Sequence, residues 1–134
     1  MLNSKPEILS SKQTLNNKPQ NSKPYDLGDR TLKFAKRVMT FVNEAPKTIT
    51  NIQISTQLIR SGGSVGANYI EAEESLSKKD FVMRIKISKK EAKESCYWLK
   101  LIETKEEQIK EKESLLQEST ELMKIFGSIV EKCR

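Results

Sequence analysis

The chain of 134 residues carries 24 lysine and arginine residues against 18 aspartate and glutamate residues, giving a formal net charge of +6 and an isoelectric point near 9.3. It contains no histidine and only two cysteines, which excludes histidine-dependent catalytic triads, histidine-ligated metal sites, a disulfide framework and a four-cysteine zinc site. Because no apolar run approaches the roughly 18 residues of a membrane span and none marks a secretory signal, we expect a small cytoplasmic protein without cofactor, metal, membrane contact or small-molecule substrate.

Residues 1–24 predict a disordered basic tail. Three of the four prolines lie here among Asn, Ser, Lys and Gln, and four lysines outnumber the single acidic residue, Glu7. Such a segment has too little apolar surface to offset the entropy cost of ordering it. A solvated leader is the simplest interpretation, and an arm that contacts nucleic acid is the alternative. The folded domain is therefore expected over 25–134.

A first helix is predicted after the tail, because apolar positions recur with the 3.6-residue helical period over 31–45. Asp29 is a suitable N-cap for this helix. Pro46 is expected to end it, since proline disfavours helical geometry in the residue before it.

A second helix is predicted to begin near Thr48, with an apolar spine over 54–76 and with Gly62, Gly63 and Gly66 in its middle. Each interior glycine costs about 1 kcal/mol of helix propensity. Close approach of another backbone would account for them, because a glycine face carries no side-chain spacers. We predict one continuous or bent helix, and a break near 62–64 is the alternative.

A capping box of Ser77 and Asp80 is expected to open a third helix that runs to about Ile102. A last helix follows, but its apolar pattern becomes clear only after about Lys112, so a loop over 104–111 is the alternative. Four helices with short connections predict an all-α, antiparallel up-down four-helix bundle. No segment alternates with period two, so no strands are expected.

The third helix carries apolar side chains on two nearly opposite faces. One face is the expected core stripe, and the other consists of Met83, Ile87, Trp98 and Leu101. A helix at the corner of a lone bundle needs only one apolar stripe, so the second predicts an interface with another subunit. Trp and Met are typical of such interfaces. Packing of Trp98 inside its own bundle is the alternative.

A basic column lies between the two stripes. It consists of residues seven positions apart and one flanking residue: Lys79, Lys86, Lys93 and Lys100, with Lys90 beside them. Residues 78–100 carry eight Lys or Arg against three acidic residues, a net of +5. The column is about 31 Å long at 1.5 Å per residue. This length and charge favour contact with a phosphate backbone of RNA or DNA, and a solvated helix face is the alternative.

Polar residues of the second and third helices predict a seam between them. Antiparallel pairing sets Arg60 level with Glu94, and Glu71 level with Arg84, with Asn68 between the two levels. Arginine–carboxylate pairs of this kind usually fix helix register. We interpret the seam as structural and not catalytic, because no nucleophile accompanies it.

Motifs in the second and third helices resemble those of a known family. They are QLIRS at 57–61, SVGANYIEA at 64–72, SKKDF at 77–81, KEAKES at 90–95 and YWL at 97–99. They are similar to the signature of bacterial four-helix-bundle proteins encoded in intervening sequences of 23S ribosomal RNA genes, over roughly 27–133. Many members carry Gly where Ala72 stands here.

The resemblance implies an antiparallel four-helix bundle that assembles as a homopentamer. The chain also resembles the accessory variability protein of diversity-generating retroelements, a basic pentameric barrel that binds nucleic acid and a reverse transcriptase. We therefore expect a non-enzymatic homo-oligomer that associates with structured RNA or DNA through the basic column. A protein-interaction scaffold with no nucleic-acid role is the alternative.

Overall fold

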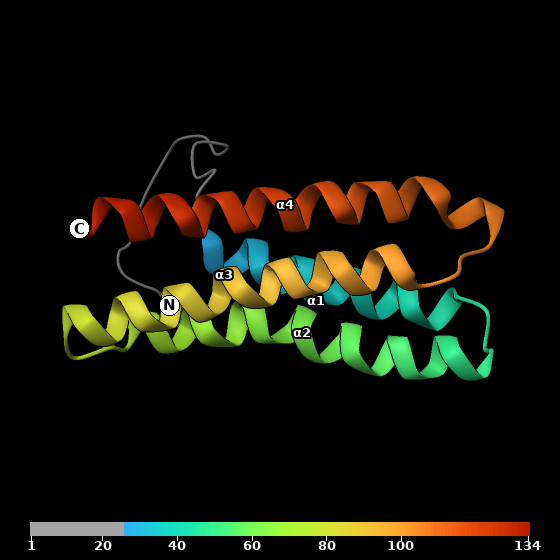
Figure 1. Ribbon diagram of the computed structural model, residues 1–134, viewed down its shortest axis with the longest axis horizontal. Helices are drawn as coiled ribbons and strands as arrows, with labels where there is room; N and C mark the ends of the chain where they lie inside the picture. Colours follow the sequence, from blue (N-terminus) through green and yellow to red (C-terminus); the bar gives the residue numbers. More distant parts are fainter. Residues whose placement is uncertain (1–25) are drawn as a thin grey trace.

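The computed structural model describes residues 26–134, which form four α-helices packed as an antiparallel up-and-down bundle (Figure 1). The elements are α1 (Leu27–Glu44), α2 (Ile49–Glu73), α3 (Lys78–Leu101), the 3₁₀ turn η2 (Glu106–Gln108) and α4 (Ile109–Lys132). The described part of the chain contains no strand, which confirms the predicted all-α bundle. The tail predicted over 1–24 lies outside the described residues.

The start of α1 differs from the prediction. Asp26, not Asp29, is the N-cap, and its Oδ1 accepts the backbone N–H of Asp29 at 3.1 Å. Leu27 is buried and belongs to the first turn, so the helix begins earlier than the apolar period alone suggested. The helix ends at Glu44, two residues before Pro46, as expected from the restriction that proline imposes on its predecessor.

The predicted start of the second helix near Thr48 and the predicted Ser77 cap of the third are both confirmed. Thr48 accepts the N–H of Asn51 at 3.2 Å, and Ser77 accepts the N–H of Asp80 at 3.1 Å. The segment 104–111 was predicted as either loop or helix, and it contains both. Residues 104–105 are loop, and the 3₁₀ turn over Glu106–Gln108 leads directly into α4 at Ile109. Gln108 fixes this turn, and its buried side chain donates to the carbonyl of Phe41 at 2.9 Å.

Helix α2 runs unbroken through its glycines, and α1 is the neighbour that requires two of them. A Cβ atom at Gly66 would lie 2.8 Å from Thr31 Oγ1, and one at Gly62 would lie 3.4 Å from Val38 Cγ2. A Cβ at Gly63 would meet no atom within 4 Å. The predicted close approach of another backbone is found only at Gly66, where a Cβ would lie 3.7 Å from the backbone carbon of Thr31; at Gly62 the neighbouring atoms belong to the Val38 side chain.

Small hydroxyl residues line the buried junction of α2 and α3. Ser61 Oγ and Ser95 Oγ lie 2.9 Å apart, and Ser88 Oγ donates to the carbonyl of Val65 at 2.9 Å. All three serines are fully buried. Their hydrogen bonds satisfy polar groups that would otherwise be costly in the core. Small side chains here let the two helices pack closely, which sets the level of the residues on either side of the junction.

One buried asparagine ties together the two loops at one end of the bundle. Asn51 Nδ2 donates to the carbonyls of Pro46 at 3.0 Å and Glu103 at 2.9 Å. Its Oδ1 accepts the backbone N–H of Glu103 at 2.9 Å. Asn51 is 1% exposed, so these bonds replace water completely. Asn51 therefore holds the α1–α2 connection next to the α3–α4 connection.

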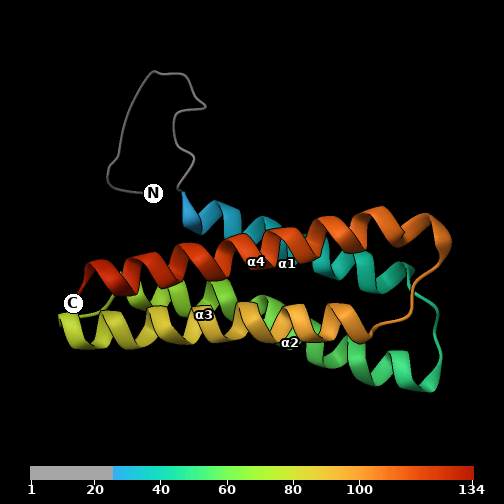
Figure 2. The ribbon, with the colours of Figure 1, turned by 45° about the horizontal axis from the view of Figure 1, so that its top comes forward.

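Two arginines of α1 connect it to α4, and the two helices run side by side in Figure 2. Arg30 donates to Glu118 at 2.7 and 2.9 Å and to Glu121 at 2.7 Å. Arg37 donates to both oxygens of Glu111 at 3.1 Å. The hydrogen bond to Glu118 is the main cause of the raised pKa of Arg30. This edge of the bundle thus depends on paired charges as well as on apolar packing.

Candidate nucleic-acid and subunit interfaces

The lysines of the predicted basic column lie on the outer surface of α3. All five are exposed, and none forms a salt bridge within 4.0 Å of an acidic group in residues 26–134: Lys79, Lys86, Lys90, Lys93 and Lys100. Their positive charges are therefore available to an anionic partner. We refer to these five residues as the lysine face.

A groove of about 350 Å³ between α3 and the last turns of α4 continues the lysine face. Its α3 side is formed by Lys86, Lys89, Lys90 and Lys93, and its α4 side includes Gly127 and Arg134. A Cβ at Gly127 would lie 3.6 Å from Lys89 Cε, an ordinary van der Waals contact, so the Lys89 side chain lies against α4 at this glycine. Lys89 and Arg134 were missed by the sequence analysis. Lys89 is three residues after Lys86, on the side of α3 that faces α4.

The predicted subunit stripe is partly exposed. Met83 is 47% and Leu101 46% exposed, whereas Ile87 and Trp98 are half-buried. Trp98 also packs against the bundle core, so part of its ring is used within its own chain. The stripe's role as an interface stays a prediction, and its exposed members are the residues through which it can be tested.

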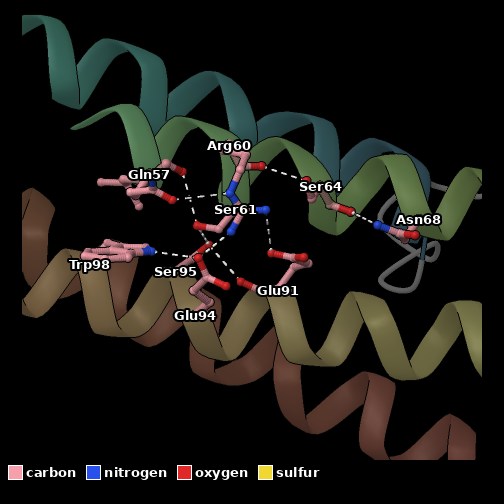
Figure 3. Close-up of polar contacts among 10 residues, drawn as sticks. Gln57, Arg60, Ser61, Ser64, Asn68, Glu91, Glu94, Ser95 and Trp98 are labelled. Atoms are coloured by element: carbon pink, nitrogen blue, oxygen red, sulfur yellow. Dashed lines mark hydrogen bonds and ion pairs between the residues drawn. The ribbon is translucent and has the colours of Figure 1, made fainter. Parts of the chain in front are cut away.

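Figure 3 shows the polar cluster between α2 and α3. Arg60 Nη2 donates to Glu94 Oε2, which confirms that these two residues lie at one level. Trp98 Nε1 donates to the same Glu94 oxygen at 2.9 Å. Arg60 Nη1 also lies 3.4 Å from Oε1 of Glu91. One guanidinium is therefore shared by two carboxylates, and one of those carboxylates, Glu94, accepts the indole N–H of Trp98.

Glu91 is the member of this cluster that the sequence analysis missed. It is 7% exposed, and its Oε1 has no hydrogen-bond partner in the described structure. A buried carboxylate is costly unless an opposite charge is near, and Arg60 supplies that charge. The available signal was its position three residues after Ser88 and four before Ser95, because this spacing puts Glu91 on the same side of α3 as these two buried serines.

The second predicted pair of the seam is wrong. Arg84 Nη1 donates to Asn68 Oδ1 at 3.0 Å, and the described residues contain no salt bridge between Arg84 and Glu71. Glu71 is exposed on α2, whereas Asn68 is half-buried at the junction with α3. Asn68 is itself held by its Nδ2, which donates to the carbonyl of Ser64 at 2.9 Å. The partner of Arg84 is therefore decided by which α2 residue faces α3, and not only by which residue lies at the same height along the bundle.

Acid titration of tryptophan fluorescence is expected to report this cluster, because Trp98 is the single tryptophan. The indole N–H of Trp98, followed by Arg60, holds the pKa of Glu94 below its ordinary value of 4.5. A lowered pKa stabilises the fold above the unfolded value, and this stability is lost as pH falls through the folded value. We therefore expect a fluorescence change centred below pH 4.5.

Two variants check the assignment of that change. In Arg60→Met the midpoint should move upward toward 4.5, because one of the causes of the lowered pKa of Glu94 is removed. In Glu94→Gln the transition should disappear. If the fluorescence transition keeps the wild-type midpoint pH in both variants, a group other than Glu94 produces the signal.

Residues that could ligate a metal ion do not gather within 26–134, where no group of three or more Asp, Glu or Cys side chains is suitably placed. Cys96 and Cys133 are free thiols. Cys96 Sγ lies 2.8 Å from Ser119 Oγ, so this cysteine belongs to the packing of α3 on α4. In the same described range, no helix is both long and apolar enough to cross a bilayer.

Comparison with known proteins adds a family and a solved relative. The family model described as 23S rRNA-intervening sequence protein matches residues 25–128. A crystal structure from Bacteroides thetaiotaomicron, described as a protein with unknown function from the S23 ribosomal protein family, is 37% identical with a TM-score of 0.65. The match covers 78% of this chain and 97% of that one. No similar sequence is found among curated proteins.

Proposed function

The chain belongs to the 23S rRNA-intervening sequence protein family, and from this premise we propose that it is a non-enzymatic, cytoplasmic homopentamer that associates with structured RNA. The observation that carries the RNA part is the lysine face, whose five side chains are exposed and without a salt bridge in the described structure. The resemblance to a pentameric nucleic-acid-binding protein supports both parts of the proposal.

Charge and length make an RNA backbone the appropriate ligand. Segment 78–100 has a net charge of +5, and the lysine face spans about 31 Å at 1.5 Å per residue. The groove beside α4 adds Lys89 to the same positive surface, whereas Arg134 in this groove is paired with Glu131 at 3.4 Å. Lysine contacts to phosphates supply sequence-independent affinity, which decreases steeply as salt displaces the released counterions.

A salt titration tests the RNA part. Fluorescence anisotropy of a labelled RNA hairpin between 50 and 200 mM salt should give a log–log slope of about −3 to −5 for four or five phosphate contacts. Changing Lys79, Lys86, Lys93 and Lys100 to Glu should abolish binding. The matched control changes four exposed lysines elsewhere, Lys33, Lys36, Lys110 and Lys124, to Glu. Equal loss in both variants would show that net charge and not α3 binds RNA.

Sedimentation tests the oligomer part. The wild-type chain at tens of micromolar is expected to sediment as a pentamer, and Met83→Glu with Leu101→Glu should reduce it to monomers by placing charge in the apolar stripe. Leu76→Glu is the control, because Leu76 is 99% exposed in the α2–α3 turn. Trp98→Glu is less informative, since Trp98 also packs on its own core. A monomeric wild type would overturn this part.

The partly exposed stripe also favours a second candidate, a protein-interaction scaffold without a nucleic-acid role. Met83 and Leu101 would then contact a different protein. This candidate predicts that the four-lysine variant and the wild type behave alike with RNA. It also predicts that the charged stripe variants lose a stoichiometric protein partner and keep their own oligomeric state.

A further inference from the structure

Tyr97 places an exposed aromatic ring within the lysine face. It is 57% exposed, and every other aromatic residue within 26–134 is buried or half-buried. It follows Lys93 by four residues and precedes Lys100 by three, so these residues are surface neighbours on one side of α3. The hydroxyl of Tyr97 has no hydrogen-bond partner in the described part of the chain. The fold therefore gives no role to the hydroxyl or to the exposed part of the ring.

The ring of Tyr97 is supported from the side by Trp98. The two ring centroids lie 5.0 Å apart with an interplanar angle of 73°, an edge-to-face contact. Trp98 is in turn fixed by its hydrogen bond to Glu94, and Glu94 by Arg60, as Figure 3 shows for these three residues. The polar cluster thus holds a tryptophan that restricts the orientation of the exposed tyrosine.

Exposed aromatic rings beside lysines are the combination that recognises unpaired nucleotides. Bases in loops and bulges stack on aromatic side chains, while nearby lysines contact the phosphates. A continuous duplex offers no free base face. Tyr97 is about one helical turn from each lysine, about 6 Å along the axis from Lys93 and about 4.5 Å from Lys100, so a base and its flanking phosphates can be contacted together.

We propose that Tyr97 stacks on an unpaired base of the bound RNA, with the adjoining phosphates on Lys93 and Lys100. This inference rests on the proposed RNA binding and specifies its substrate class: an RNA hairpin or bulge and not an uninterrupted duplex. Tyr97 acts as the stacking residue, and Trp98, Glu94 and Arg60 act as positioning residues behind it.

The test uses the full chain with two RNAs of equal length, a hairpin with 2-aminopurine in its loop and a perfect duplex with 2-aminopurine in a pair. For the wild type, binding should quench the loop probe and leave the duplex probe unchanged. Tyr97→Leu should weaken hairpin binding roughly 5- to 100-fold and abolish quenching, since one stacked base is worth that much. Tyr97→Phe should retain both, and Leu76→Ala is the surface control.

The outcomes separate this inference from the function on which it rests. The stacking role is wrong, while RNA binding stands, if the wild type binds hairpin and duplex without quenching the loop probe. The same holds if Tyr97→Leu lowers the affinity for both RNAs equally. No binding of either RNA by the wild type would overturn both. A Tyr97→Leu variant with altered sedimentation would assign the residue to the subunit contact instead. Circular dichroism should show unchanged helicity for each variant.

Discussion

Replacing Arg60 with methionine is expected to lower the free energy of unfolding by about 2–3 kcal/mol, because the change leaves the buried Glu91 carboxylate without its cationic neighbour. Losing one partner of a fully buried pair typically costs more, about 3–5 kcal/mol. The smaller value follows from the exposure of Arg60, through which water can reach the carboxylate after the substitution. Urea unfolding followed by circular dichroism at pH 7 measures the difference.

The same experiment contains its own control. Glu91→Gln in the Arg60→Met background should recover most of the lost stability, because the glutamine removes the unpaired buried charge. Lys33→Met on exposed α1 surface should change stability by less than about 0.5 kcal/mol. If Arg60→Met costs no more than Lys33→Met, or if Glu91→Gln makes it worse, the carboxylate is not what the guanidinium stabilises.

Asn51→Leu is expected to destabilise the bundle by a similar amount, about 2–3 kcal/mol, although the new side chain has the same branching and the same number of non-hydrogen atoms. The change removes three hydrogen bonds to Pro46 and Glu103 and leaves their backbone groups partly unsatisfied beside an apolar side chain. Thermal unfolding should show this as a lower Tm with the same helicity at low temperature.

Two variants test whether those hydrogen bonds are responsible. Gln53→Leu places the same side chain at an exposed position of α2 and should leave Tm nearly unchanged. Asn51→Asp keeps the acceptor for the Glu103 N–H but places a buried carboxylate oxygen against the carbonyls of Pro46 and Glu103, so at pH 7 its Tm should be at least as low as that of Asn51→Leu. Equal Tm values for Asn51→Leu and Gln53→Leu would contradict the role of the asparagine.

The helix boundaries that could be predicted are those set by local chemistry. Pro46, Thr48 and Ser77 act through their own backbone or side chain, so one sequence is enough to place them. The start of α1 was placed late because Asp26 and Asp29 are equally good caps, and only the burial of Leu27 decides between them. That burial depends on the packing of other helices, which local pattern does not contain.

The candidate sites divide in the same way. The Arg60–Glu94 contact follows from counting residues on either side of a turn, and the outward position of the lysine face follows from helical period. Counting residues does not give the rotation of each helix about its axis. That rotation buries Glu91 and turns Glu71 away from Arg84, so one residue was missed and one pair was wrong.

The two ends of the bundle are fastened unequally, and this affects where the fold can open. At one end Asn51 and Gln108 bind loop to loop and loop to helix. At the other end, the α2–α3 turn lies near the last turn of α4 (Figure 1). The described structure contains no buried side-chain hydrogen bond between these two segments. Local opening costs least where few buried hydrogen bonds must break. The lysine-lined groove lies toward this end, so we expect amide hydrogen exchange to be faster along its walls than around Asn51 and Gln108.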